Sequence, residues 1–543
     1  MVSRMLAVPV RRVSGWVAET DANYARAWLA ALPMADSAEA AREVYQALFR
    51  VNRIDIKAPA RLELLSLYAP AVAAIGTALQ PQLSHSVPPL TPQKREPAEL
   101  LRRLHIEMAH GYRRCWHDLR QTRVLLRRKR RSALCIERGL FHLGEVLFLS
   151  YLLYLPYPIG VWREIHELYR LAESMGIAEA AIEATDAGEA GAVSITARYV
   201  QTLLLGVTNP YQFPHNAVQP MRALLRQWGP QAHLSTPTPI KEATGCFYVD
   251  LSSDAPPIPL AKKSAELAEH ARILHAADLL ATVQRLAARA DAGASVERLE
   301  LGVDCLDNVG TDLLRRLTRA LGDVGRRRYA RRQHSSDVLV CIGLDALHYF
   351  ANGRRPFAAY VDACRFLHAT SRRVDHADVS SAGSVPDDHA RARSARRIGR
   401  WRLRDVAPQG MSLARHGDAV PVRVGDLIGI QQIGDVGRWR PAVIRWIKSP
   451  ETNSLEIGVE LLAAAIVPVA VRSKDASARP ALRLPDVEAL HHPAALVLES
   501  ASAQVGDEFE LMEETADTRR VKLVRLLERT AAFEQFVYEL SRG

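Results

Sequence analysis

Two clusters in the second half of the chain combine residue types that could hold a guanine base and a phosphate. The first is the stretch RRRYARR, in which Arg326, Arg327 and Arg331 precede an apolar run, and the second is DVAPQG, which contains Asp405 and Gly410. An Arg guanidinium can grip a phosphate or the O6/N7 edge of guanine with two hydrogen bonds. A carboxylate can accept from guanine's N1–H and exocyclic amine, and Gly permits close approach of the backbone. Together these residues predict a site for guanine and phosphate.

Motifs that would indicate catalysis are missing from the sequence. It contains no GxxxxGK[ST], no HExxH, no GxSxG and no convincing GxGxxG. His270 and His275 are five residues apart, off a common helix face, and His491 and His492 lie in a loop-like stretch. We therefore expect neither an enzyme nor a metal site. Of the functions considered, a nucleotide-processing enzyme is the least favoured.

The first part of the chain has the apolar spacing of helices. Between about 20 and 230, apolar residues recur at intervals of three and four, and breakers fall at 84–93, 154–160 and 209–214. The pattern predicts a helical domain over 1–235, built from hairpins that resemble those of a solenoid. The basic run 127–131 is interpreted as a solvated helix face, with contact to a polyanion as the alternative.

A mixed segment, 236–320, should connect this domain to a β-rich region. Within it we expect a strand near 246, an amphipathic helix over 264–290, a short strand over 296–305 and a helix over 306–325.

The guanine and phosphate residues fall in a region of short, turn-separated strands, 321–470. Such spacing is typical of a small antiparallel barrel. Strands are expected at 336–343, 346–350, 400–407, 422–433, 439–448 and 454–462. Residues 371–398 are polar and almost free of large apolar groups, which predicts a disordered insertion. A smaller β unit follows over 471–543, so the predicted fold class is α+β and multidomain.

The order of these motifs resembles the PilZ domain, the bacterial receptor module for cyclic di-GMP. The resemblance rests on RxxxR, then [DN]xSxxG, VxVGDxxxI, VxRW and IGVE, over roughly 326–470. It implies that Arg327 and Arg331, with Arg326 beside them, wrap the ligand, and that Asp405 and Gly410 hold a guanine. Ala407 stands where the family has Ser.

The resemblance implies a role without catalysis and without a cofactor other than the ligand cyclic di-GMP. It implies an effector that relays the second messenger to motility, pilus, biofilm or virulence machinery, with the helical part expected to bind a protein partner. The alternative is a scaffold or nucleic-acid-associated protein whose PilZ-like barrel has lost its ligand.

Composition is that of an ordinary globular protein. The chain has 543 residues, 24% charged and 48% hydrophobic, with a net charge of +11 and six scattered Cys. The charge would suit nucleic acid, which is nonetheless the less favoured partner. The longest apolar stretch, 146–162, is too short and too rich in Pro to span a bilayer, so we expect a buried helix and turn, no transmembrane segment and a cytoplasmic location.

Overall fold

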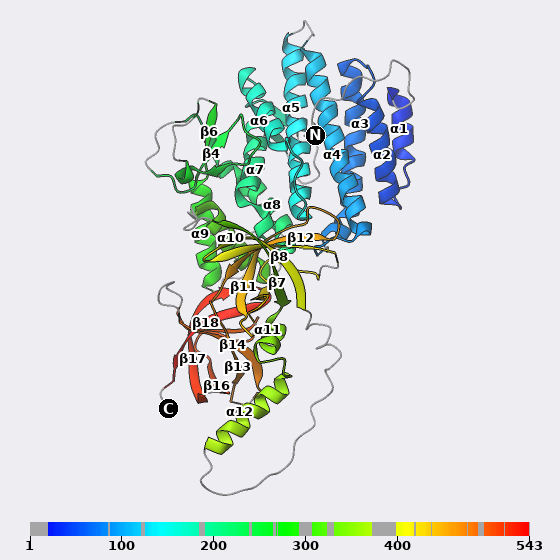
Figure 1. Ribbon diagram of the computed structural model, residues 1–543. Helices are drawn as coiled ribbons and strands as arrows, with labels where there is room; N and C mark the ends of the chain where they lie inside the picture. Colours follow the sequence, from blue (N-terminus) through cyan, green and yellow to red (C-terminus); the bar gives the residue numbers. More distant parts are fainter. Residues whose placement is uncertain are drawn as a thin grey trace. The chain divides into compact units, whose positions relative to one another are not determined.

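The computed structural model divides into two units, Met1–Arg326 and Arg327–Gly543 (Figure 1). The described residues are 20–84, 87–120, 125–183, 191–237, 242–263, 268, 270–292, 307–322, 331–371, 398–417, 420–435, 437–474, 476–486, 493–514 and 516–541. Arg326, Arg327, the strand expected over 296–305 and nearly all of the insertion expected over 371–398 lie outside them.

The first unit begins with helices, as the apolar spacing predicts. They are α1 (Ala22–Ala30), α2 (Ser37–Val51), α3 (Ala58–Ser84), α4 (Pro92–Leu119), α5 (Leu125–Leu152), α6 (Val161–Ser174), α7 (Ile195–Thr208) and α8 (His215–Trp228). A short hairpin, β1 (Ala181–Glu183) and β2 (Ala192–Ser194), precedes α7. The expected breakers at 84–93, 154–160 and 209–214 separate α3 from α4, α5 from α6 and α7 from α8. The helical prediction is confirmed.

Helices α4 and α5 lie side by side at the centre of the helical array (Figure 1). Along α4, Leu101, Leu104, Met108 and Tyr112 recur at intervals of three or four residues and are all buried. This spacing places them on one face, and burying that face stabilises the helix pair.

Among the described residues, one helix segment is long and apolar enough to cross a membrane by length and composition: Ala58–Leu83 in α3. The apolar stretch 146–162 instead runs from α5 through a turn into α6, as expected. Core helices of globular proteins meet the same criteria, and α3 packs against α1, α2 and α4.

The connecting segment forms a small sheet with two helices. The strands β3 (His233–Ser235), β6 (Ala271–His275), β4 (Cys246–Asp250) and β5 (Ile258–Pro259) pair in that order, followed by α9 (Ala277–Asp291) and α10 (Asp307–Gly322). The prediction of a single helix over 264–290 was wrong in its first part. Residues 271–275 form the strand β6 because β3 and β4 pair with it on both sides, and tertiary pairing overrides local helix propensity.

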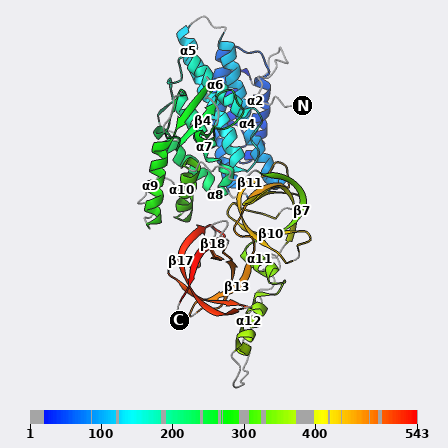
Figure 2. The ribbon, with the colours of Figure 1, turned by 60° about the vertical axis from the view of Figure 1, so that its left-hand side comes forward.

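The second unit contains a closed antiparallel barrel. Its strands are β7 (Arg332–Ile342), β8 (Ile398–Ala407), β9 (Gly410–His416), β10 (Leu427–Gln432), β11 (Arg440–Lys448) and β12 (Ser454–Leu461), in the spatial order β10-β11-β12-β9-β8-β7. Figure 2 shows this barrel nearly end-on. The predicted PilZ-like barrel is confirmed.

The expected strand at 346–350 was wrong, because these residues belong to helix α11 (Leu344–Ala351). Leu344, Leu347 and Ala351 follow helical spacing and pack into a core shared with the next barrel. Gly429 in β10 faces this helix, and any side chain there would overlap Leu347. Helix α12 (Phe357–Ser371) comes next along the chain.

The C-terminal β unit is a second closed barrel. Its strands are β13 (Val467–Arg472), β14 (Arg479–Leu484), β15 (Ala495–Glu499), β18 (Phe533–Leu540), β17 (Ala516–Arg529) and β16 (Glu508–Glu513), in that spatial order. The sequence predicts a smaller β unit over 471–543, and the observed barrel begins slightly earlier, with β13 at Val467. Both barrels contribute to the shared core, with Trp439 from the first and Phe533 from the second.

Candidate functional site

The DVAPQG segment forms the hairpin between β8 and β9. Ala407 at the end of β8 pairs with Gly410 at the start of β9. Earlier in β8, Trp401 and Leu403 are buried and alternate with exposed arginines. A bulge between Leu403 and Asp405 shifts this alternation. Asp405 therefore lies on the outer face of the barrel, with its side chain 20% exposed.

Gly410 is required by the close approach of β12. A Cβ at this position would lie 2.6 Å from the carbonyl oxygen of Val459, on the neighbouring strand. The backbone carbonyl of Gln409 also accepts a hydrogen bond from the Leu461 amide at 3.0 Å. The glycine of the motif therefore seats the hairpin against β12, which fixes where Asp405 and Ala407 stand.

Arg331 and Asp405 are in direct contact although 74 residues separate them. Arg331 Nη1 donates to Asp405 Oδ1 at 2.8 Å, with side chains 31% and 20% exposed. The contact follows from the pairing of β7 with β8, which sets Gln333 opposite Asp405. The structure thus brings one arginine of RxxxR to the aspartate of the hairpin. Arg326 and Arg327 lie outside the described residues.

A row of paired residues crosses the outer face of the barrel at Asp405. Asp405 pairs with Ser412 on β9, Ser412 with Gly458 on β12, and Gly458 with Trp446 on β11. Any side chain at Gly458 would overlap the indole of Trp446. The indole therefore lies across Gly458, in the direction of the β8–β9 hairpin. Trp446 is partly exposed, so this aromatic ring lies on the same outer face as Asp405, three strands along the row.

Trp446 and Ser412 were not among the residues singled out from the sequence. In the sequence analysis Trp446 is only part of the VxRW motif. Its outward direction follows from the bulge between Ile444 and Trp446 and from the glycine across the ladder. Ser412 offers a hydroxyl on the strand next to Ala407, which has none. The positions of Trp446 and Ser412 on this face follow only from the pairing register of β9, β11 and β12.

Arg445, next to Trp446, joins the two barrels. Its Nε donates to Glu460 at 2.6 Å and its two Nη atoms to Glu528 of β17, one of them at 2.9 Å. Burial would lower the pKa of Arg445, but the contact with Glu528 raises it above the ordinary value. Glu460 pairs with Gly410 in the β12–β9 ladder. This arginine is therefore a charged link between the site barrel and the C-terminal barrel.

Two other arginines of β8 contact carboxylates of the same barrel, Arg404 one on β12 and Arg400 one on β7. Arg404 contacts Glu456 at 2.9 Å and Arg400 contacts Asp337 at 3.6 Å. In the first unit, the basic run 127–131 lies in the first two turns of α5, where Lys129 is exposed. Within the described parts of the chain, no group of three or more His, Cys, Asp or Glu side chains is placed to hold a metal ion.

A six-stranded barrel with an Arg–Asp pair on its outer face, built from RxxxR and a [DN]xSxxG-type hairpin, defines the chain as a PilZ-domain protein. A family model described as the middle PilZ domain of the cyclic-di-GMP receptor FimW matches residues 246–397 and 368–468. The model of the FimW N-terminal domain matches residues 23–239, and that of the FimW C-terminal β-barrel domain matches 464–541. The chain therefore belongs to the PilZ proteins with the FimW arrangement of domains.

A curated relative covers almost the whole chain. It is the cyclic-di-GMP receptor FimW of Pseudomonas aeruginosa, 27% identical over 551 aligned positions that span 94% of this chain and 89% of the relative. No solved structure matches the chain.

Proposed function

We propose that this protein is a cyclic-di-GMP receptor whose ligand binds the outer face of the first barrel at Arg331 and Asp405. The observation that carries the proposal is the 2.8 Å contact between these two side chains. It joins the two PilZ motifs that are far apart in the sequence. The resemblance to FimW, a cyclic-di-GMP receptor by name, supports the same ligand.

Each group on this face has a role that its chemistry suits. Arg331, together with Arg326 and Arg327, donates to the phosphates and to the acceptor edge of guanine. Asp405 accepts from the N1–H and amine of a guanine. Trp446 offers a flat ring on which a base can stack. Gly410 acts indirectly, because it holds the hairpin against β12.

The hairpin lacks the hydroxyl of the family pattern, because Ala407 stands where the family has Ser. Its side chain cannot donate to a base, so binding rests on the arginines and Asp405. Ser412 faces Asp405 across the ladder and is the nearest hydroxyl on the adjacent strand. It is 7% exposed in the free protein.

Without ligand, Arg331 and Asp405 contact each other. A ligand that binds both side chains must replace this contact with contacts of its own. Guanine supplies two donors for the carboxylate and phosphate supplies acceptors for the guanidinium, so both charges stay paired in the complex. A ligand without guanine does not offer the Asp405 carboxylate the same pair of donors, so its affinity should be lower.

We further infer a non-catalytic, cytoplasmic effector that passes the ligand signal to a protein partner. The helical region is the part assigned to that partner, in the motility, pilus, biofilm or virulence machinery that the resemblance suggests. The alternative is a scaffold or nucleic-acid-associated protein with an inactive barrel, for which exposed basic residues such as Lys129 would provide contacts.

Titration calorimetry of the full chain with cyclic di-GMP, GTP and a DNA duplex at two salt concentrations separates these functions. Saturable binding of cyclic di-GMP in preference to GTP supports the receptor. Binding of the duplex that falls steeply with salt, with no response to either nucleotide, supports the alternative. A variant with Arg438 changed to Ala serves as the matched control, because this exposed arginine lies outside the Arg331–Asp405 face.

A further inference from the structure

The adjoining ends of α4 and α5 are strongly basic. The stretch 119–136 contains seven Lys or Arg residues and no Asp or Glu. Five of these side chains are exposed or partly exposed and are here called the basic tip: Arg120, Arg128, Lys129, Arg130 and Arg131. Figures 1 and 2 both show the first turns of α5 at one end of the helical unit, beyond the end of α6. The basic tip is therefore placed to meet a partner that approaches this end.

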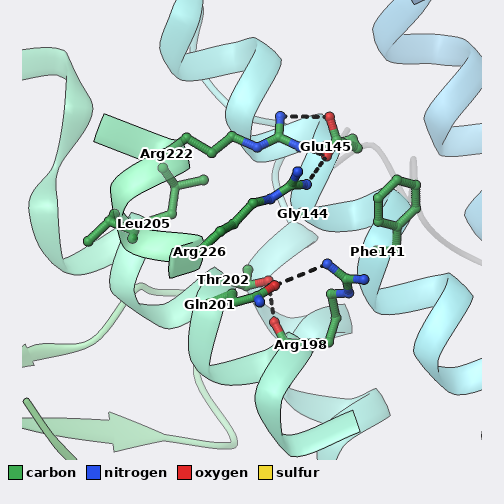
Figure 3. A pocket seen from close by; sticks show the side chains of 10 residues that line it. Phe141, Gly144, Glu145, Arg198, Gln201, Thr202, Leu205, Arg222 and Arg226 are labelled. Atoms are coloured by element: carbon green, nitrogen blue, oxygen red, sulfur yellow. Dashed lines mark hydrogen bonds and ion pairs between the residues drawn. The ribbon is translucent and has the colours of Figure 1, made fainter. Parts of the chain in front are cut away.

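Arginines that pack against the middle of α5 have carboxylate partners, unlike those of the basic tip. Figure 3 shows Arg222 and Arg226 of α8 in contact with Glu145 of α5, at 2.9 Å and 3.4 Å. Asp118, the acidic residue next to the tip in sequence, contacts Arg114 at 3.5 Å. Within the described part of the chain, no Asp or Glu forms an ion pair with the five residues of the basic tip. Their charges therefore face solvent without a counter-charge from the described residues.

The position of these cations at the start of α5 costs helix stability. The first turns of a helix lie at the positive end of its macrodipole, which disfavours Lys and Arg there. Arg128 and Arg131 are three residues apart, and so are neighbours on the helix surface, where like charges repel. No acidic residue stands within four positions of the run 127–131 to offset this repulsion. An anionic partner would supply the missing counter-charge and remove the cost.

The order of the basic residues favours a flat partner over a groove. Residues 128–131 are consecutive, and consecutive positions lie about 100° apart around a helix, so their side chains point all round it. A helix that lies lengthwise in a nucleic-acid groove turns one face to its partner and would engage only part of this set. A surface that meets the helix end-on can engage all of it.

The four charges of α5 also lie close to the end of the helix. At about 1.5 Å per residue, Arg131 is only about 9 Å along the axis from Leu125, where α5 begins. That depth is within the roughly 10 Å over which charges interact at moderate salt. A flat anionic surface at the end of α5 therefore attracts all four.

We propose that the basic tip binds the surface of an anionic lipid membrane. Leu125 and Leu126 directly precede the basic run, and segments that combine apolar with basic residues bind membrane surfaces. Each Lys or Arg held close to an anionic lipid surface strengthens binding about fivefold. The contact holds the chain against one face of the membrane and needs no transmembrane segment.

The basic tip is separate from the proposed cyclic-di-GMP site. Its residues belong to the unit Met1–Arg326, whereas Arg331 and Asp405 belong to Arg327–Gly543. Either assignment can fail without the other.

The experiment is co-sedimentation of the full chain with vesicles of equal parts phosphatidylglycerol and phosphatidylcholine, and with vesicles of phosphatidylcholine alone. We expect binding to the anionic vesicles that weakens as salt rises, and little binding to the neutral ones. The tip variant, which combines Arg128→Gln, Lys129→Gln and Arg130→Gln, should bind the anionic vesicles at least about fiftyfold more weakly.

A matched control removes the same number of charges elsewhere in the helical unit. It combines Arg103→Gln, Arg163→Gln and Arg319→Gln, at exposed positions of α4, α6 and α10, and should bind anionic vesicles like the wild type.

The melting temperature of the tip variant should stay the same or rise, because the substitutions remove repulsion at the start of α5. If this variant does not fold, Lys129→Gln alone should still weaken vesicle binding about fivefold.

The proposal is overturned if the chain does not bind anionic vesicles, if it binds neutral vesicles as tightly, or if the folded tip variant binds like the wild type. Equal weakening in the matched control would show a response to net charge alone, which also overturns it. Titration with a DNA duplex covers the other polyanion. Duplex binding that the tip variant loses, without binding to vesicles, would assign the basic tip to nucleic acid and overturn the membrane assignment.

Discussion

At the scale of single residues, Arg331 and Asp405 are the proposed contacts of cyclic di-GMP. Arg331→Ala should weaken cyclic-di-GMP binding by about tenfold to hundredfold, the range for hydrogen bonds to charged groups. Arg331→Lys should restore little, because an ammonium group cannot reproduce the guanidinium fork. Calorimetry measures both variants, with Arg438→Ala as the control. Equal affinities of Arg331→Ala and the wild type would remove Arg331 from the site.

Ala407 offers a change that should improve binding. Its side chain lies at the end of β8 beside the Arg331–Asp405 pair. Ala407→Ser adds one neutral hydrogen bond, worth about two- to tenfold in affinity. Ala407→Val adds bulk without a hydroxyl and should not tighten binding. Asp405→Ala should weaken cyclic-di-GMP binding by at least the factor by which Ala407→Ser strengthens it. If Ala407→Ser and the wild type both fail to bind at high ligand concentration, the barrel has lost its ligand.

Trp446 tests whether a base stacks on the outer face. Stacking on an aromatic ring contributes about 1–3 kcal/mol per base. Trp446→Phe should therefore nearly keep the affinity for cyclic di-GMP, while Trp446→Leu should lower it at least about fivefold. The indole also covers Gly458, so the melting temperature of each variant is recorded alongside. A Leu variant that melts normally and binds normally would show that the ring takes no part.

At the scale of elements, the sequence predicts the barrel strands well and the site only in part. Strands β7, β8, β10, β11 and β12 follow from apolar runs and turn signals, whereas β9, which completes the hairpin that carries Asp405, was not predicted. Two further features escape a reading of local pattern. Residues 271–275 become a strand because neighbours pair on both sides, and Trp446 faces outward because of a bulge. Both depend on partners distant in sequence.

Helix α11 contributes a buried histidine that makes stability depend on pH. His348 Nε2 lies 3.2 Å from the Val469 carbonyl and Nδ1 lies 3.2 Å from Asn352 Nδ2, which suits the neutral ring. Burial lowers the pKa of His348 from 6.5 to about 4. The unfolded chain therefore takes up a proton first as pH falls. This histidine's contribution is complete above about pH 6.5 and is lost between pH 6.5 and 4.

The loss should reach on the order of 3 kcal/mol at pH 4 relative to pH 7.5. Urea unfolding of the wild type and His348→Gln at several pH values measures it, since the difference between the two proteins isolates this residue. His334→Gln, an exposed histidine of β7, is the control and should behave as the wild type. A pH dependence that is the same in His348→Gln and the wild type would contradict the assignment.

At the scale of the whole molecule, the ion pair between Arg445 and Glu528 ties the two barrels of the second unit together. Glu528→Gln keeps the shape of the side chain and removes its charge. Because the pair is partly exposed, the expected loss of stability is about 1–2 kcal/mol. Scanning calorimetry should show a lower melting temperature for the barrel transition. Glu508→Gln, which neutralises an exposed carboxylate of β16, should leave that temperature unchanged. Equal shifts in both variants would show that Glu528 acts only through net charge.

The site on the first barrel is tested most directly by hydrogen–deuterium exchange of the full chain with and without cyclic di-GMP. The account predicts slower exchange in peptides that cover 326–335 and 403–412, the two segments that meet at Arg331 and Asp405. The same peptides should show no change with ATP, which lacks guanine, and the Asp405→Ala variant should lose the protection by cyclic di-GMP. Protection by cyclic di-GMP confined to other segments, or its persistence in Asp405→Ala, would contradict the assignment of the ligand to this face.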